Sequence, residues 1–145
     1  MQASTMPDSV GRDLLIEIAT EEMAHVEILH KMIECLTKGA TVEEIKSLQV
    51  EGNYAEHGFG IYPTDVGTVP FSVAYLASSG DVITDLTEDL AAEEKARAAY
   101  EHLMDLTNNP EILAPLSFLR QREIIHYQRF AEALKHYQEK NDSSK

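Results

Sequence analysis

The chain has 145 residues, a length typical of one domain built around a single hydrophobic core. Its 25 acidic and 12 basic residues give a formal net charge of −13, and such a surface repels nucleic acid and anionic membranes, because both require a positive patch. Glycine (7) and proline (5) are scarce and tryptophan is absent, so the composition favours helices over sheets.

The sequence also carries no signal for secretion or membrane insertion. The first eight residues have neither a basic start nor the apolar run of a signal peptide, and no segment reaches the roughly 18 to 20 apolar residues that span a bilayer. Cys35 is the single cysteine, which rules out an intrachain disulfide and fits a reducing compartment. We therefore expect a soluble, cytoplasmic protein.

The first predicted element is a long helix from about Ser9 to Leu36. Pro7 is expected in its first turn, where a missing backbone N–H is tolerated. Gly39 is expected to end it.

A short helix and a long irregular segment are expected next. Thr41 and Glu44 have the spacing of a capping box, which predicts a helix start. Residues 51–70 contain six glycine or proline residues and predict a loop with a functional or interface role. Residues 71–77 are apolar and fit either a short helix or a strand.

Two further long helices are predicted in the second half of the chain. One spans about Asp81–Asn108, with an aspartate N-cap. The other has Asn109 as its cap, a first turn broken by Pro115, and a regular part over about 115–138. Residues 139–145 are expected to be a disordered tail. The chain is thus predicted to be one all-α domain.

Each long helix has an apolar face that ionisable residues interrupt near the middle. Steps of three and four residues keep side chains on one face of a helix. The neighbouring Glu21 and Glu94 fall off these faces and are expected to be solvated. In chain order, the three faces carry Leu15, Ile18, Glu22, His25, Leu29, Met32 and Leu36; Ile83, Leu86, Leu90, Glu93, Arg97, Tyr100 and Met104; and Leu116, Leu119, Glu123, His126, Phe130 and Leu134.

Three explanations compete for these polar interruptions. The charges can pair with one another, with Arg97 as the cation; they can lie at an exposed edge; or they can hold metal ions. Burying an ionised carboxylate without compensation costs several kcal/mol. Glutamate and histidine interrupt all three helices at the same height, accompanied only by Arg97, and this favours metal ions, whose charge offsets that of the carboxylates.

The spacing of these residues matches a two-metal site in a helical bundle. Glu22 with His25 and Glu123 with His126 both form Glu-x-x-His, which places both side chains within reach of one ion. The two-ion arrangement combines two such motifs with one glutamate from each of two further helices. Glu93 supplies one of these, so the pattern lacks one glutamate and the helix that carries it.

At these residues the chain resembles the manganese catalases, including their spore-coat relatives. The similarity runs from residue 8 to about 136 and includes the order and spacing of the motifs. The matching stretches are DLLIEIATEEMAHVE (13–27), GTVPFSVAYLASSGD (67–81), DLAAEEKARAAY (89–100) and FLRQREIIHYQRFAEAL (118–134).

The resemblance implies a ferritin-like bundle that holds two manganese ions and disproportionates hydrogen peroxide to water and dioxygen. Glu22 would bridge the metals, His25 and His126 would each bind one, and Glu93 would be a further ligand. Glu123 would handle protons beside the metals, whereas its spacing alone makes it a ligand. Arg97, one turn after Glu93, would orient or neutralise a ligand, or form an ordinary ion pair.

Two other functions remain open at this point. One is a structural protein of the spore-coat or shell type with a vestigial site. The other is a ferritin-like di-iron protein, since oxygen-rich ligation suits iron as well as manganese. Members of the family begin with another long helix that provides a glutamate ligand, and the residues before Ser9 are too few for it. The apolar groove left open predicts a covering partner chain, hence a homo-oligomer.

Overall fold

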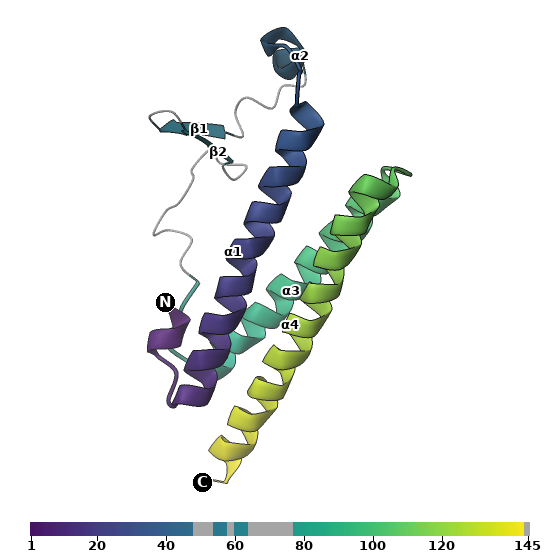
Figure 1. Cartoon of the computed structure of the whole chain (residues 1–145). Coiled ribbons are helices and arrows are strands. Elements are labelled where there is room, and N and C mark those ends of the chain that lie inside the picture. Colours follow the sequence, from purple (N-terminus) through teal and green to yellow (C-terminus); the bar gives the residue numbers. More distant parts are fainter. Residues whose placement is uncertain (48–53, 58–59, 64–76, 144–145) are drawn as a thin grey trace. The chain divides into compact units, whose positions relative to one another are not determined.

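The computed structural model describes residues 1–47, 54–57, 60–63 and 77–143. Its elements, shown in Figure 1, are η1 (Gln2–Ser4), α1 (Ser9–Thr37), α2 (Val42–Ser47), β1 (Tyr54–His57), β2 (Gly60–Pro63), α3 (Val82–Asp105) and α4 (Pro110–Asp142). The three long helices lie where they were predicted, so the all-α fold class is confirmed.

The chain divides into two compact units. One consists of Met1–His25 with Ala77–Lys145, and the other of Val26–Leu76. The prediction of a single domain therefore stays a prediction. None of the helices in the described part of the chain has the length and apolar character that crossing a membrane requires.

The ends of the three long helices follow local sequence signals, with one correction. Asp81 caps α3 by accepting from Thr84 N, and Asn109 caps α4 by accepting from Glu111 N, as predicted. In α1, Asp8 accepts from Gly11 N at 3.2 Å and the helix begins at Ser9, so Pro7 precedes the helix rather than lying in its first turn.

Helix α4 contradicts two predictions. It is continuous from Pro110 to Asp142, with Pro115 inside it, so the first turn is not broken. Pro115 costs the helix one backbone hydrogen bond. The side chain of Leu119, one turn later, is fully buried, and its burial stabilises the helical conformation of this segment. At the other end, a disordered tail was predicted from residue 139, but residues 139–142 are helical. The helix therefore extends past its last buried side chain, Tyr137.

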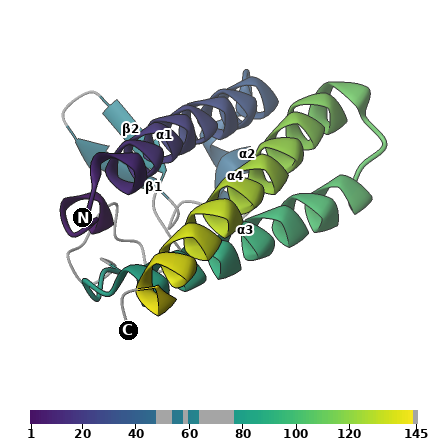
Figure 2. The same cartoon turned by 90° about the horizontal axis from the view of Figure 1, so that it is seen from below.

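The first unit is organised around a core contributed by all three long helices. Helices α3 and α4 run side by side in opposite directions, joined by a short connection (Figure 2). Partly buried residues of the N-terminal segment, among them Ala3 and Met6, pack against the core. The buried core residues are Leu15 and Ile18 of α1, Leu86 of α3, and Phe130 and Tyr137 of α4.

A buried aspartate fastens the segment before α3 to that helix. The side chain of Asp85 accepts from Ser79 N at 2.8 Å, Ser79 Oγ at 2.5 Å and Gly80 N at 3.3 Å. Burial raises the pKa of Asp85, but these hydrogen bonds outweigh it and the net shift is downward. The sequence reading did not single out Asp85, because its partners lie in the loop that precedes its own helix.

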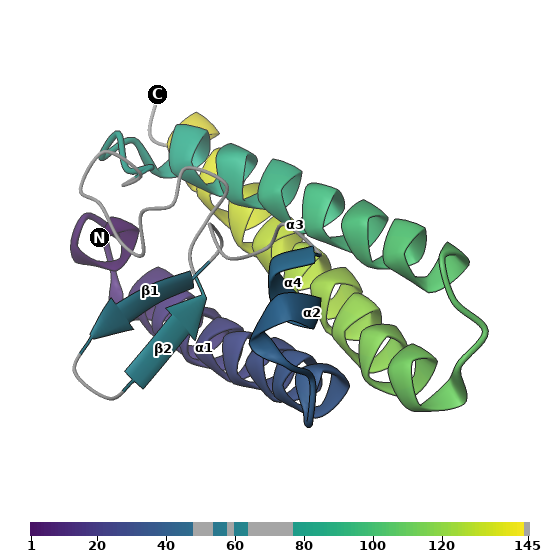
Figure 3. The ribbon, with the colours of Figure 1, turned by 90° about the horizontal axis from the view of Figure 1, so that it is seen from above.

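The second unit contains the end of α1, the helix α2 and a β-hairpin. The capping box is confirmed: Thr41 N donates to Glu44 Oε2 at 2.7 Å and Glu44 N donates to Thr41 Oγ1 at 3.2 Å. Strands β1 and β2 pair antiparallel, from Tyr54 opposite Pro63 to His57 opposite Gly60 (Figure 3).

The hairpin corrects the prediction that residues 51–70 form a loop throughout. Strands of four residues are too short to produce a clear alternating pattern, and the glycine and proline content dominated the sequence signal. The apolar segment predicted as a short helix or strand lies, apart from Ala77, outside the described residues.

Gly11→Ala is expected to lower the free energy of unfolding by about 1–3 kcal/mol. A Cβ at this position would overlap the hydroxyl oxygen of Tyr137, which donates a 2.6 Å hydrogen bond to Asp8. Overpacking at this contact costs about 1–3 kcal/mol, and loss of the hydrogen bond to Asp8 costs about 1 kcal/mol more. The gain in helix propensity of about 1 kcal/mol offsets only part of this total. Urea denaturation followed by circular dichroism measures the difference.

Tyr137→Phe provides the control for this prediction. With no hydroxyl to displace, Gly11→Ala should cost measurably less in the Tyr137→Phe background than in the wild type. An equal cost in both backgrounds would show that contact with the tyrosine hydroxyl is not the cause.

Candidate metal centre

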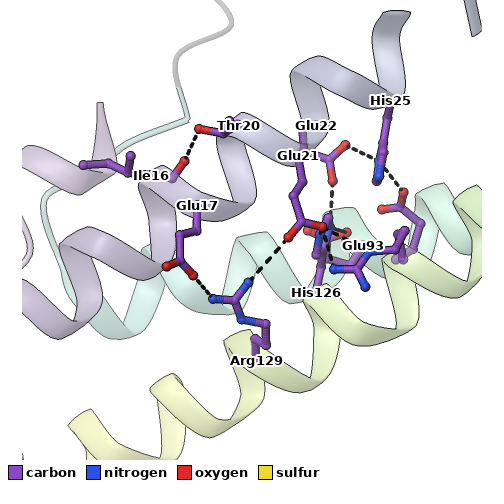
Figure 4. A network of polar contacts seen from close by, with 11 residues as sticks. Ile16, Glu17, Thr20, Glu21, Glu22, His25, Glu93, His126 and Arg129 are labelled. Atoms are coloured by element: carbon purple, nitrogen blue, oxygen red, sulfur yellow. Dashed lines mark hydrogen bonds and ion pairs between the residues drawn. The ribbon is translucent and has the colours of Figure 1, made fainter. Parts of the chain in front are cut away.

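Three helices of the first unit bring four ionisable side chains to one place. Glu22 of α1, Glu93 of α3, and Glu123 and His126 of α4 each offer one oxygen or nitrogen atom, and these atoms all lie within 4.8 Å of one another. His25 joins them, since its Nδ1 lies 3.2 Å from Glu22 Oε2 and 3.2 Å from Glu123 Oε1. Figure 4 shows Glu22, His25, Glu93 and His126 converging between the helices.

Four members of the cluster are buried, and the fifth is partly exposed. His25, Glu93, Glu123 and His126 expose between 0 and 7% of their surface. The side chain of Glu22, by contrast, is 42% exposed. Glu22 is thus the member through which a small molecule from solvent would reach the others.

The convergent atoms leave hydrogen-bonding capacity unused. His126 Nδ1 lies 2.8 Å from Glu22 Oε1 and 3.8 Å from Glu93 Oε2, but it forms no hydrogen bond with suitable geometry to either. Among the described residues, Glu22 Oε1, His25 Nδ1 and Glu123 Oε1 are likewise buried without a hydrogen-bond partner. Buried polar atoms that face one another in this way fit a cation placed between them.

The chemistry of these side chains narrows the choice of cation. Carboxylate oxygens outnumber imidazole nitrogens, and no thiolate belongs to the cluster. Hard, oxygen-rich ligation with a minority of imidazoles suits manganese or iron better than zinc or copper. The residues therefore fit a manganese or iron centre.

Crowding of the carboxylates shifts the pKa values of the cluster when no cation offsets their charge. Burial raises the pKa of Glu123 to about 9, reinforced by a hydrogen bond with Glu93 and by the charges of Glu22 and Glu93. Burial alone would lower the pKa of His126, but the nearby carboxylates of Glu22, Glu93 and Glu21 stabilise the protonated ring, outweigh this effect and raise the pKa to about 10. The metal-free cluster thus retains protons where a metal-loaded one would hold ions.

The contacts of Glu21 with His126 and Arg122 contradict the prediction that this residue is solvated. Its Oε2 lies 3.0 Å from His126 Nε2 and accepts from Arg122 Nε at 3.0 Å. The sequence reading missed it because Glu21 lies beside, not on, the apolar face of α1. The available signal was Arg122, which lies one turn before His126 on the same side of α4.

The structure does not bring Arg97 into the cluster. Its guanidinium donates to Glu94 Oε2 at 2.8 Å and to Glu101 Oε2 at 2.7 Å, both on its own helix α3. Glu101 also accepts from Arg120 Nε of α4 at 2.7 Å, so these residues form an ion-pair network between the two helices. The alternative interpretation of Arg97, an ordinary ion pair, has these contacts in its favour, whereas a catalytic role has none. Glu94, predicted to be solvated, is part of this partly exposed network.

The metal-free protein is expected to lose stability as the pH rises from 7 to 9. The pKa values of Glu123 and His126 are both raised, so in this window the folded protein binds more protons than the unfolded chain. Glu123→Gln imitates the protonated acid and should remove roughly half of the slope, because each of the two groups takes up about one proton on folding. Urea denaturation of chelator-treated protein at pH 7, 8 and 9 measures this, and equal slopes for wild type and variant would contradict it.

Comparisons with known proteins show which family the whole chain resembles. The family model described as "Manganese containing catalase" matches residues 1–144. Protein CotJC of Bacillus subtilis (strain 168) is 42% identical over 144 residues, which cover 99% of this chain and 76% of that protein. The "Probable manganese catalase" of Clostridium acetobutylicum is 29% identical over 133 residues, and the manganese catalase of Bacillus subtilis is 29% identical over 136 residues.

The matches differ in how much of each relative they cover. The chain spans 59% of the Clostridium acetobutylicum protein and 50% of the Bacillus subtilis catalase. No solved structure matched the chain. The family match confirms both the suspected resemblance and the ferritin-like, all-α fold class.

Proposed function

Because the chain belongs to the family of manganese-containing catalases, we propose that it binds two manganese ions between α1, α3 and α4 and disproportionates hydrogen peroxide to water and dioxygen. The observation that carries this proposal is the convergence of five buried or half-buried Glu and His side chains. Several of their own buried oxygen and nitrogen atoms lack hydrogen-bond partners. Bound manganese would supply the two-electron redox chemistry that interconverts peroxide, water and dioxygen.

Glu22, His25, Glu93 and His126 are the proposed metal ligands. Glu22 would hold metal together with both histidines, because its Oε2 lies 3.2 Å from His25 Nδ1 and its Oε1 lies 2.8 Å from His126 Nδ1. The two imidazole rings are stacked, with centroids 5.5 Å apart. One carboxylate between two histidines therefore has an oxygen for the ion beside each of them.

Glu123 is the proposed proton-handling group. Disproportionation of two peroxide molecules requires two protons of one molecule to end on the oxygen atoms of the other, so a carboxyl group beside the metals can accept and return them. Glu123 is 2% exposed, and its Oε1 lies 3.2 Å from His25 Nδ1. The burial of the cluster favours a small substrate such as peroxide over larger reductants.

The proposed assembly is a homo-oligomer in the cytoplasm. On the same helix as Glu22, the apolar side chains of Ile16 and Met23 are 51% and 66% exposed. Exposed apolar side chains on a helix that carries the site support a covering protein chain. Sedimentation velocity analysis measures the assembly state, and a monomer at micromolar concentration would refute this part of the proposal.

A second candidate function is a structural protein in which the site no longer holds metal. The observation in its favour is the 42% identity to CotJC, whose name states no catalytic activity, against 29% for the two catalases. A third candidate is a ferritin-like di-iron protein, which the oxygen-rich residues also suit.

Elemental analysis of purified protein, combined with oxygen evolution after peroxide addition, distinguishes the three candidates. Two manganese ions per chain with oxygen release support the catalase. A folded protein without metal, even after growth in manganese-rich medium, supports the structural protein. Iron with slow peroxide consumption and no oxygen release supports the di-iron protein.

Glu93→Ala is expected to reduce the manganese content to below a tenth of the wild-type value and to abolish oxygen release. The carboxylate of Glu93 is buried in the cluster, so no solvent-exposed group can take its place. The matched control is Glu94→Ala, which changes the next residue of α3 and removes only a partly exposed ion pair with Arg97. Retention of metal and activity by Glu93→Ala would refute the ligand assignment.

A further inference from the structure

The imidazole of His126 is held from two opposite sides. Its Nδ1 faces the cluster, 2.8 Å from Glu22 Oε1, while its Nε2 lies 3.0 Å from Glu21 Oε2 (Figure 4). An ionised carboxylate can only accept a hydrogen bond. Nε2 therefore carries the hydrogen in this contact, and the ring is oriented with Nδ1 toward the cluster.

Glu21 is itself fixed by two arginines of α4. Arg122 donates to Glu21 Oε2 from Nε at 3.0 Å and from Nη2 at 2.5 Å. Arg129 Nη1 lies 3.9 Å from Glu21 Oε1. Arg122, His126 and Arg129 follow one another by four and three residues, so they share one side of α4 and meet a single carboxylate from α1.

We infer that Glu21 is a positioning residue, which sets the ring orientation of His126 for metal binding and is held in place by Arg122. This inference rests on the proposed function. A carboxylate on the far nitrogen of a metal-binding histidine fixes the ring and increases the basicity of the ligand nitrogen, and its loss typically weakens metal binding 10- to 100-fold.

The chain offers a matched ion pair that lacks the histidine. Glu17, one turn before Glu21 on α1, pairs with Arg129 of α4 and is 66% exposed. It links the same two helices as the Glu21–Arg122 pair, but it does not contact His126 in the described structure. Comparison of Glu21 with Glu17 therefore separates positioning of the histidine from docking of the helices.

The test is the Mn²⁺ affinity of purified, metal-free variants, measured by titration with Mn²⁺ alone. Glu21→Ala should weaken binding 10- to 100-fold, and Glu21→Gln should restore part of the loss, because an amide oxygen accepts the same Nε2–H. Glu17→Ala should change the affinity by less than about twofold. Arg122→Ala should weaken binding, and the loss in Glu21→Ala/Arg122→Ala should be no larger than that of Glu21→Ala.

The possible failures point to different conclusions. A wild-type protein that binds no Mn²⁺ refutes the proposed function, and this inference with it. A wild-type protein that binds Mn²⁺ while Glu21→Ala retains its affinity refutes this inference alone. An equal loss in Glu17→Ala and Glu21→Ala would assign the effect to helix docking and would also refute it.

A measurement without metal tests the contact itself. In metal-free protein labelled with ¹⁵N-histidine, the Nε2–H proton of His126 should give a low-field resonance that exchanges slowly with water, because it is fully buried and donates to a carboxylate. The resonance is assigned by its absence in His126→Gln. It should persist in Glu17→Ala and disappear in Glu21→Ala, and its absence from the wild type would contradict the contact.

Discussion

Three carboxylates that repel one another meet between the long helices, and this repulsion limits how the helices can pack. Glu22, Glu93 and Glu123 come from three different helices, so the helices cannot pack at this height unless protons or cations offset the charge. In the metal-free protein, protons on Glu123 and His126 do so. Metal binding and protonation are thus alternatives within one cluster, and helix packing depends on one or the other, so stability and function involve the same side chains.

The apolar core keeps the cluster in place from one end of the first unit. Leu15 and Ile18 lie one to two turns before Glu22 on α1, and Phe130 lies one turn after His126 on α4. The ion pair between Glu21 of α1 and Arg122 of α4 joins the two helices beside the cluster. Rigid helices rather than loops therefore carry every proposed ligand, which favours a precise metal geometry.

Periodicity along each helix predicted the fold class and the cluster, but the sequence could not predict how the chain resolves local conflicts. Pro115 signals a helix break, yet burial of Leu119 outweighs the lost hydrogen bond. The hairpin could not be predicted in a glycine- and proline-rich segment, because strands of four residues are too short to show a clear alternation of apolar and polar residues. Arg97 lies on the predicted face of α3, but its long side chain pairs with the neighbouring Glu94 and Glu101 instead of the cluster.

By itself, the sequence determined that three amphipathic helices would carry glutamate and histidine at matching heights, because spacing within one helix fixes which side chains share a face. Only the tertiary structure decided which of them meet. The rotation and offset of α1 against α4 bring Glu21 onto His126 and leave Glu22 half exposed. These contacts depend on packing between residues about one hundred positions apart, and no local pattern in the chain encodes that packing.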